Sequence, residues 1–115
     1  MTAAELIRGD RPGRLRLRGD VGLENVRQLW ERGRTELAGQ RQLEIDLSEV
    51  ERTDSAGVAL LVAWTREAHA GGVVIRFANI PDQIRAIAHV CGVEAILPFP
   101  QASENAADND ESSQS

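Results

Sequence analysis

The stretch VERTDSAGVALLVAW, residues 50–64, decides the fold prediction. In it a charged segment passes through Asp54-Ser55-Ala56-Gly57 into seven apolar residues, Val58–Trp64. An ordinary surface helix carries one apolar stripe and one polar face, but this segment is apolar nearly all round. We therefore expect its second apolar side to be buried as well, either by the same chain or by another protein.

Helical periodicity separates the two sides of the segment. The side expected in the core consists of Gly57, Leu60, Leu61, Trp64 and Ala68, at helical spacing. The other side carries Ser55, Val58, Ala59, Val62 and Arg66. Such a helix is either buried on both sides or half covered by a partner, and periodicity leaves both open.

Strand and helix patterns alternate along the rest of the chain. Short apolar runs and apolar–polar alternation predict strands at residues 4–8, 14–18, 43–47, 73–78 and 93–99. Apolar periodicity and glycine stops predict helices at residues 24–38, 55–70 and 81–91. This order predicts an α/β fold with a mixed, mainly parallel sheet covered by helices. The run 73–78 is apolar on both faces and is expected to be a central strand.

Two further core assignments follow from the helical stripes. In the first helix the stripe is expected to contain Leu23, Val26, Trp30, Gly33 and Leu37, with Leu29 at its margin. In the last helix Cys91 completes a stripe that begins at Ile84, so Cys91 is expected in the core.

Composition limits the class of protein. The 115 residues suffice for one small domain, and 42% of them are apolar, which is normal for a soluble globular chain. We find no apolar run long enough for a membrane span or a signal peptide, and one cysteine excludes an internal disulfide. A cytoplasmic protein is expected.

Most of the net negative charge of the sequence lies at its C-terminal end. Four of the 18 acidic residues, Glu104, Asp108, Asp110 and Glu111, lie in the last fifteen positions, without a basic residue among them. We expect one domain over residues 1–100 and a disordered acidic tail over 101–115. Residues 1–100 are nearly neutral and contain few aromatic residues, so nucleic acid is not an expected partner.

The arginines at positions 14, 16 and 18 alternate with leucines. Such a row could contact anionic lipid or an acidic partner. Protection of a sheet face by charge is the interpretation that we favour.

Catalysis is not expected. Ser55 and His69 would lie about 20 Å apart along one helix, which is too far for a nucleophile and its base. His89 has no partner nearby in the sequence, and neither a nucleophile elbow nor a phosphate-binding loop is present. No metal or cofactor is predicted.

The residues quoted so far carry a family resemblance. IDLSEVERTDSAGVALLVAW, followed by GGVVIRFANIPDQIRAIAHVCGVEAILPF, resembles a STAS domain, the fold of sulphate-transporter tails and anti-sigma-factor antagonists. The resemblance covers about residues 4–99. Within the family, Leu-Trp-Glu at 29–31 and D-[ST]-x-G-x-A-L-L at 54–61 are most similar to the cytoplasmic STAS subunit of Mla phospholipid-transport ABC complexes.

This resemblance implies a non-catalytic subunit that binds the ATPase subunit of the transporter and supports its assembly and activity. The protein would then be peripheral to the inner membrane through its complex. The family's hydroxyl residue falls on Ser55 and its first-helix tryptophan on Trp30, which would then lie at the edge of the core, half packed and half in contact with the partner. The predicted partner-binding residues are Trp30, Asp54, Ser55, Val58, Ala59, Val62 and Arg66.

Ser55 also supports a second interpretation. Asp54 or Ser55 could cap the helix, but a phosphate on Ser55 would equally be stabilised at the helix N-terminus. Mla members carry threonine at this position, whereas serine is the phosphorylated residue of the anti-sigma-factor antagonists. The chain would then bind an anti-sigma-factor kinase until Ser55 is phosphorylated. Thr53, where those antagonists usually have an apolar residue, favours the transporter interpretation.

Overall fold

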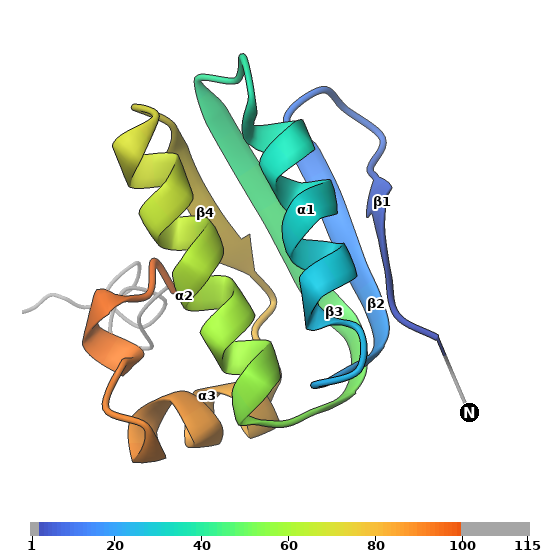
Figure 1. Cartoon of the computed structure of the whole chain (residues 1–115), viewed down its shortest axis with the longest axis vertical. Helices are drawn as coiled ribbons and strands as arrows, with labels where there is room; N and C mark the ends of the chain where they lie inside the picture. The colour runs from blue at the N-terminus through green and yellow to red at the C-terminus, as the bar shows by residue number, and fades with distance from the viewer. Residues whose placement is uncertain (1–2, 100–115) are drawn as a thin grey trace, which may run out of the picture.

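The computed structural model describes residues 3–99 as a four-stranded sheet with its helices packed on one face (Figure 1). Its elements are β1 (Glu5–Arg8), β2 (Arg14–Val21), α1 (Val26–Leu37), β3 (Gln42–Thr53), α2 (Ser55–Ala70), β4 (Val74–Ala78), α3 (Asp82–Val90) and the 3-10 turn η1 (Glu94–Ile96). The strands lie in the order β1-β2-β3-β4. The predicted tail, residues 101–115, lies outside the described residues.

Strand directions match the predicted fold class. β1 runs antiparallel to β2, whereas β2, β3 and β4 are parallel to one another. α1 connects β2 to β3, and α2 connects β3 to β4, as parallel strands require. The mixed, mainly parallel α/β sheet is therefore confirmed.

Alternation along the strands creates the core. The inward residues of β2, β3 and β4 are buried under the helices: Leu15, Leu17, Leu43, Ile45, Leu47, Ile75 and Phe77. The predicted stripe of α2 meets them, and its Trp64 is completely buried. Burial of these apolar side chains is the main source of stability, at about 25 cal/mol per Å² of apolar surface.

The opposite face of the sheet is open and charged. Arg14 pairs with Glu44 across β2 and β3, with an Nη2–Oε2 distance of 3.4 Å. Arg16 and Arg18 pair in the same way with Glu49, and Arg18 also pairs with Glu5. The arginine row thus forms a solvated, charge-paired face, as we favoured from the sequence.

The predicted strand at 93–99 is wrong. Glu94–Ile96 form a 3-10 turn, and a single backbone hydrogen bond, from the N–H of Phe77 to the carbonyl of Pro98, joins the described part of this segment to β4. β4 is consequently an edge strand of the sheet, not a central one. Its outward residues Val74 and Arg76 are exposed, so β4 is buried on one face and not on both, as the apolar run had predicted.

Three smaller expectations also fail. Cys91 is exposed, because α3 ends at Val90 and only Ile84 and Ala88 of that helix are buried. Leu23 is exposed before the start of α1, whereas Leu29 is in the core. β3 continues to Thr53, six residues beyond the predicted end of the strand at position 47, since pairing with β2 persists through two irregularities in register.

Among residues 3–99 no helix has the length and apolar character needed to cross a bilayer.

Candidate functional site

The N-terminus of α2 is capped by the residue that precedes it. Asp54 is extended, and its Oδ1 accepts hydrogen bonds from the backbone N–H groups of Ala56 at 2.9 Å and Gly57 at 3.2 Å. Asp54 is therefore the N-cap, and it supplies partners for amide groups that a helix otherwise leaves unpaired. Ser55 is the first helical residue and is exposed, so its side chain is not used as the cap.

Glycine at position 57 allows the close approach of α2 to the sheet. A Cβ atom there would overlap the Oγ1 of Thr53 and lie 3.2 Å from the carbonyl oxygen of Val21. Only glycine avoids this clash, because it has no side chain. The tight packing at Gly57 sets the position of Ser55 at the surface.

A hollow of about 270 Å³ lies along the outer side of α2. Its walls combine predicted site residues with residues that follow α3: Ser55, Val58, Ala59, Val62, Ala63, Arg66, Cys91 and Val93. Most of these side chains are small and apolar. Residues 3–99 thus cover the second apolar side of α2 only in part.

Val58 differs from the other predicted site residues of α2 because it is buried. Its side chain is only 2% exposed, so the expectation that it lies on the outer side of α2 is wrong. α3 packs near the start of α2 (Figure 1), and Val58 belongs to the buried core. Val58 forms the floor of the hollow, whereas Ser55, Ala59 and Arg66 are exposed and Val62 is half-buried.

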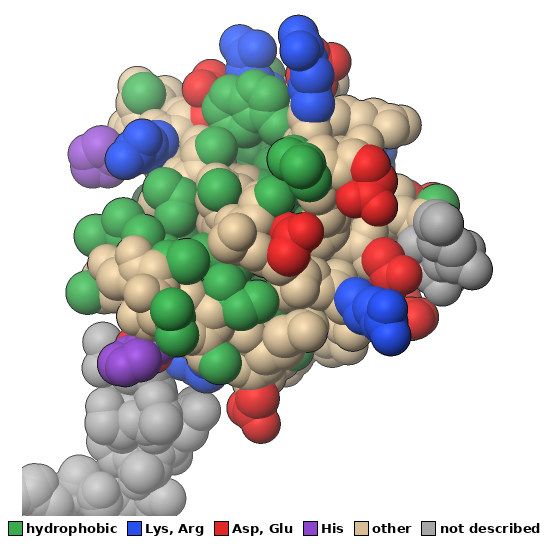
Figure 2. All heavy atoms as spheres, turned by 60° about the horizontal axis from the view of Figure 1, so that its bottom comes forward, with side chains coloured by type: hydrophobic (Ala, Val, Ile, Leu, Met, Phe, Trp, Pro, Cys, Tyr) green, Lys and Arg blue, Asp and Glu red, His purple; other side chains and the backbone are tan. Residues whose placement is uncertain are grey.

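The apolar surface continues beyond the hollow. Val90 is 84% exposed at the end of α3, and Ile96 is 57% exposed in η1. Figure 2 shows apolar side chains gathered over one half of this face and acidic side chains over the other. A contiguous apolar patch of this kind is characteristic of a protein-binding surface.

Trp30 lies on the neighbouring helix α1, outside the residues that line the hollow. It is half-buried, and its backbone carbonyl accepts a hydrogen bond from the indole N–H of Trp64 at 3.3 Å. The guanidinium carbon of Arg34 is 5.6 Å from the centroid of its ring. Trp30 is therefore packed on one side and accessible on the other.

The region beside Ser55 is acidic. A Cβ atom on Gly22 would lie 3.1 Å from Oε1 of Glu24 and 3.2 Å from Oδ2 of Asp54, so the two carboxylates lie close together. At the other end of the hollow Arg66 is exposed, and no carboxylate of residues 3–99 pairs with it. The surface thus has an acidic end and a basic end with small apolar side chains between them.

Three wall residues, Ala63, Cys91 and Val93, were not predicted as site residues. Cys91 and Val93 reach the hollow only because α3 folds back beside α2, and no local pattern signals that contact. Neither histidine lines the hollow. His89 pairs with Glu94 at 3.0 Å, and His69 lies near the far end of α2. Within residues 3–99 no three His, Cys, Asp or Glu side chains are grouped as a metal ion would need.

Comparisons with solved structures agree on the fold. The anti-sigma factor antagonist SpoIIAA of Bacillus, in its unphosphorylated form, is 17% identical, with a TM-score of 0.65 over 92% of this chain and 95% of that one. A candidate anti-sigma factor antagonist of Thermotoga maritima is 16% identical, with a TM-score of 0.67 over 91% and 92%. The structure of the Pseudomonas aeruginosa diguanylate cyclase SiaD with its activator SiaC matches at 23% identity and a TM-score of 0.55, over 85% and 89%.

At these identities the structures establish the shared fold alone. No curated protein matches the chain by sequence. The family model described as the MlaB STAS domain matches residues 6–98, which is nearly all of the described chain. The chain therefore belongs to the STAS-domain family, and within it to the MlaB type.

Proposed function

We propose that this protein is the non-catalytic STAS subunit of an Mla-type phospholipid-transport ABC complex, in which it binds the ATPase subunit and supports its assembly and activity. Such a complex maintains the lipid asymmetry of the outer membrane. The protein would be cytoplasmic and held at the inner membrane through its partner. This proposal extends the MlaB family assignment to a specific partner.

One observation carries the proposal: the exposed hydroxyl residue at the start of α2 borders an apolar hollow that residues 3–99 leave uncovered. Ser55 and Ala59 are small, so a partner's backbone could approach α2 closely. Val62 supplies apolar contact above the buried floor residue Val58. An interface needs such a desolvated centre with a polar rim, and Arg66 and Asp54 lie where the rim would be.

Trp30 would contribute from the neighbouring helix. Its inner side is fixed by the bond between its carbonyl and Trp64, and its outer side is accessible. Half-packed tryptophans often anchor interfaces, because they bury a large area at low entropic cost. The similar fold of SiaC, the activator of the cyclase SiaD, is compatible with a regulatory subunit of this kind.

The decisive experiment is affinity purification of the tagged protein from its own host, with captured proteins identified by mass spectrometry. We expect an Mla-type ATPase subunit, captured by the wild type but not by the Val62→Glu variant. Arg41→Glu is the control, since Arg41 is an exposed residue between α1 and β3 and does not line the hollow. The ATPase activity of the purified partner should then rise when this protein is added.

An anti-sigma-factor antagonist is the alternative, and the exposed Ser55 favours it. A phosphate there would meet the acidic group formed by Asp54 and Glu24, while Asp54 already accepts the amides of Ala56 and Gly57. Phosphorylation would thus add negative charge beside two carboxylates at the contact surface, and a kinase partner would be released. Capture of an anti-sigma-factor kinase, with phosphate on Ser55, would replace the transporter proposal by this one.

A further inference from the structure

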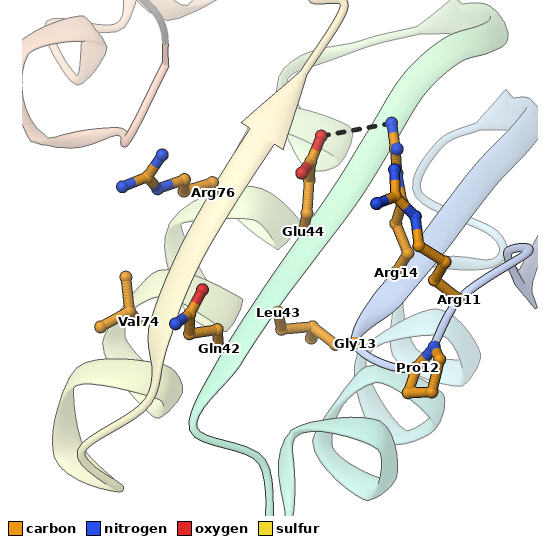
Figure 3. A pocket seen from close by; sticks show the side chains of 9 residues that line it. All are labelled: Arg11, Pro12, Gly13, Arg14, Gln42, Leu43, Glu44, Val74 and Arg76. Atoms are coloured by element: carbon orange, nitrogen blue, oxygen red, sulfur yellow. Dashed lines mark ion pairs between the residues drawn. The ribbon is translucent and has the colours of Figure 1, made fainter.

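The open face of the sheet contains a second hollow, of about 330 Å³, where β2, β3 and β4 begin. Four charged side chains line it: Arg11, Arg14, Glu44 and Arg76. This site lies on the opposite side of the sheet from the helices, which appear behind the strands in Figure 3. It is therefore separate from the surface on α2.

Positive charge in this hollow is only partly neutralised. Glu44 pairs with Arg14, as the dashed line in Figure 3 shows, and Arg76 extends from β4 away from Glu44. Within residues 3–99, neither Arg11 nor Arg76 has a carboxylate partner. Two positive charges are left without compensation at the edge of the sheet.

The described part of the chain ends beside this edge. The ring of Phe99 packs against Phe77 of β4, with 6.0 Å between centroids, and the N–H of Phe77 bonds to Pro98. Arg76 is the neighbour of Phe77 on the same strand and faces the other side of the sheet. The next residues of the chain therefore start next to the strand that carries Arg76.

The segment that follows has the complementary charge and sufficient length. It contains Glu104, Asp108, Asp110 and Glu111 and no basic residue. Five residues of chain span up to about 17 Å. Two strand spacings, from β4 to β2, amount to only about 10 Å.

We propose that the acidic segment, residues 101–115, docks on this hollow through its carboxylates. Covalent attachment gives such a segment an effective local concentration of roughly millimolar, which favours weak contacts. Guanidinium groups bind carboxylates in a bidentate geometry, and the contact requires charge, not a defined fold of the segment. The contact neutralises Arg11 and Arg76, which have no carboxylate partner among residues 3–99.

Amide chemical shifts in the full chain and in a chain ending at Pro100 test this proposal. At low salt we expect differences at the backbone of Gly13, Gln42 and Arg76, around the hollow. They should shrink at least about threefold between about 20 mM and about 500 mM NaCl, because salt screens exposed charges. Replacing the four carboxylates by amides (Glu104→Gln, Asp108→Asn, Asp110→Asn and Glu111→Gln) should reproduce the spectrum of the shortened chain.

Reversing the charge of two arginines that line the hollow is a second test of the proposal. Arg11→Glu with Arg76→Glu should abolish the shift differences, whereas Arg27→Glu, an exposed charge on α1, should leave them. The proposal is overturned if the two chains give the same spectrum at low salt, or if the differences lie around the hollow on α2. Differences that disappear on dilution would assign the contact to a second copy of the chain and would also overturn it.

Discussion

The indole N–H of Trp64 donates a 3.3 Å hydrogen bond to the backbone carbonyl of Trp30, so a completely buried side chain of α2 fixes the edge tryptophan of α1. The two helices approach closely enough for this bond because α1 has glycine at position 33. A Cβ atom on Gly33 would overlap the indole nitrogen of Trp64 and lie 2.8 Å from its Cζ2. Packing at this point therefore couples the core to the proposed interface.

Gly33→Ala should lower the free energy of unfolding by about 1–3 kcal/mol, the usual cost of overpacking a core. The added methyl group must displace either Trp64 or α1, since neither has free space. Urea unfolding followed by circular dichroism measures this change. Gly71→Ala is the matched control, because a Cβ there would meet only an ordinary contact, 3.5 Å from the carbonyl oxygen of Glu67. Equal stability of the two variants would contradict the close packing at Gly33.

Asp46 should make stability depend on pH. Burial raises its pKa, but hydrogen bonds from Ser48 and Asn79, with the charge of Arg14, outweigh burial and hold the pKa below the ordinary value. The backbone N–H of Ser48 is 2.8 Å from Oδ1. Because the folded-state pKa is lowered, the stabilisation is present above the unfolded pKa of about 3.9 and is lost as the pH falls below it.

Asp46→Asn should therefore destabilise the protein at neutral pH and cost progressively less as the solution is acidified. Urea unfolding of wild type and variant at pH values of about 7 and about 3 measures the difference. The side chain of Asp46 is only partly buried, so the effect should be small. A difference that stays constant between the two pH values would contradict the prediction.

The order of strands and helices could be predicted because its signals are local. Helical spacing at Gly57, Leu60 and Leu61 identifies the core side of α2 from a single stretch of sequence. Alternation at Leu43 and Ile45 likewise identifies the inward face of β3. The motif at Asp54–Gly57 then identified the family, which the match over residues 6–98 shows.

The predictions that proved wrong concern features that depend on contacts between distant segments of the chain. The apolar run of β4 is compatible with a central strand, and only the absence of a further described strand beside it makes it an edge. Cys91 continues the periodicity of α3, but the helix ends one residue before it. Val58 falls on the outer side of α2 by spacing, yet its side chain is buried in the core. Spacing along one helix does not reveal where its neighbours end.

Ser55→Asp should weaken partner binding by about 2 kcal/mol or more, because it would bury a charge beside two existing carboxylates. It should leave the domain folded, since Asp54 remains the N-cap and an acidic residue in the first turn is favourable there. Isothermal titration with the captured ATPase measures the affinity. Ser55→Ala is the control and should bind nearly as wild type, because it keeps the residue small. Equal affinity of Ser55→Asp and Ser55→Ala would exclude Ser55 from the interface.

Adjacent substitutions on α2 separate the interface from the core. Leu61 is 1% exposed, so Leu61→Glu would place an unpaired charge in the core and should unfold the domain. Val62 is half-buried on the wall of the hollow, so a glutamate there can reach water and the fold should persist. Val62→Glu should nevertheless abolish partner binding, because the same glutamate would be desolvated at the interface. Circular dichroism and co-purification measure the two effects separately. If Val62→Glu is as unstable as Leu61→Glu, then α2 is a core helix on both sides and the hollow is not a docking surface.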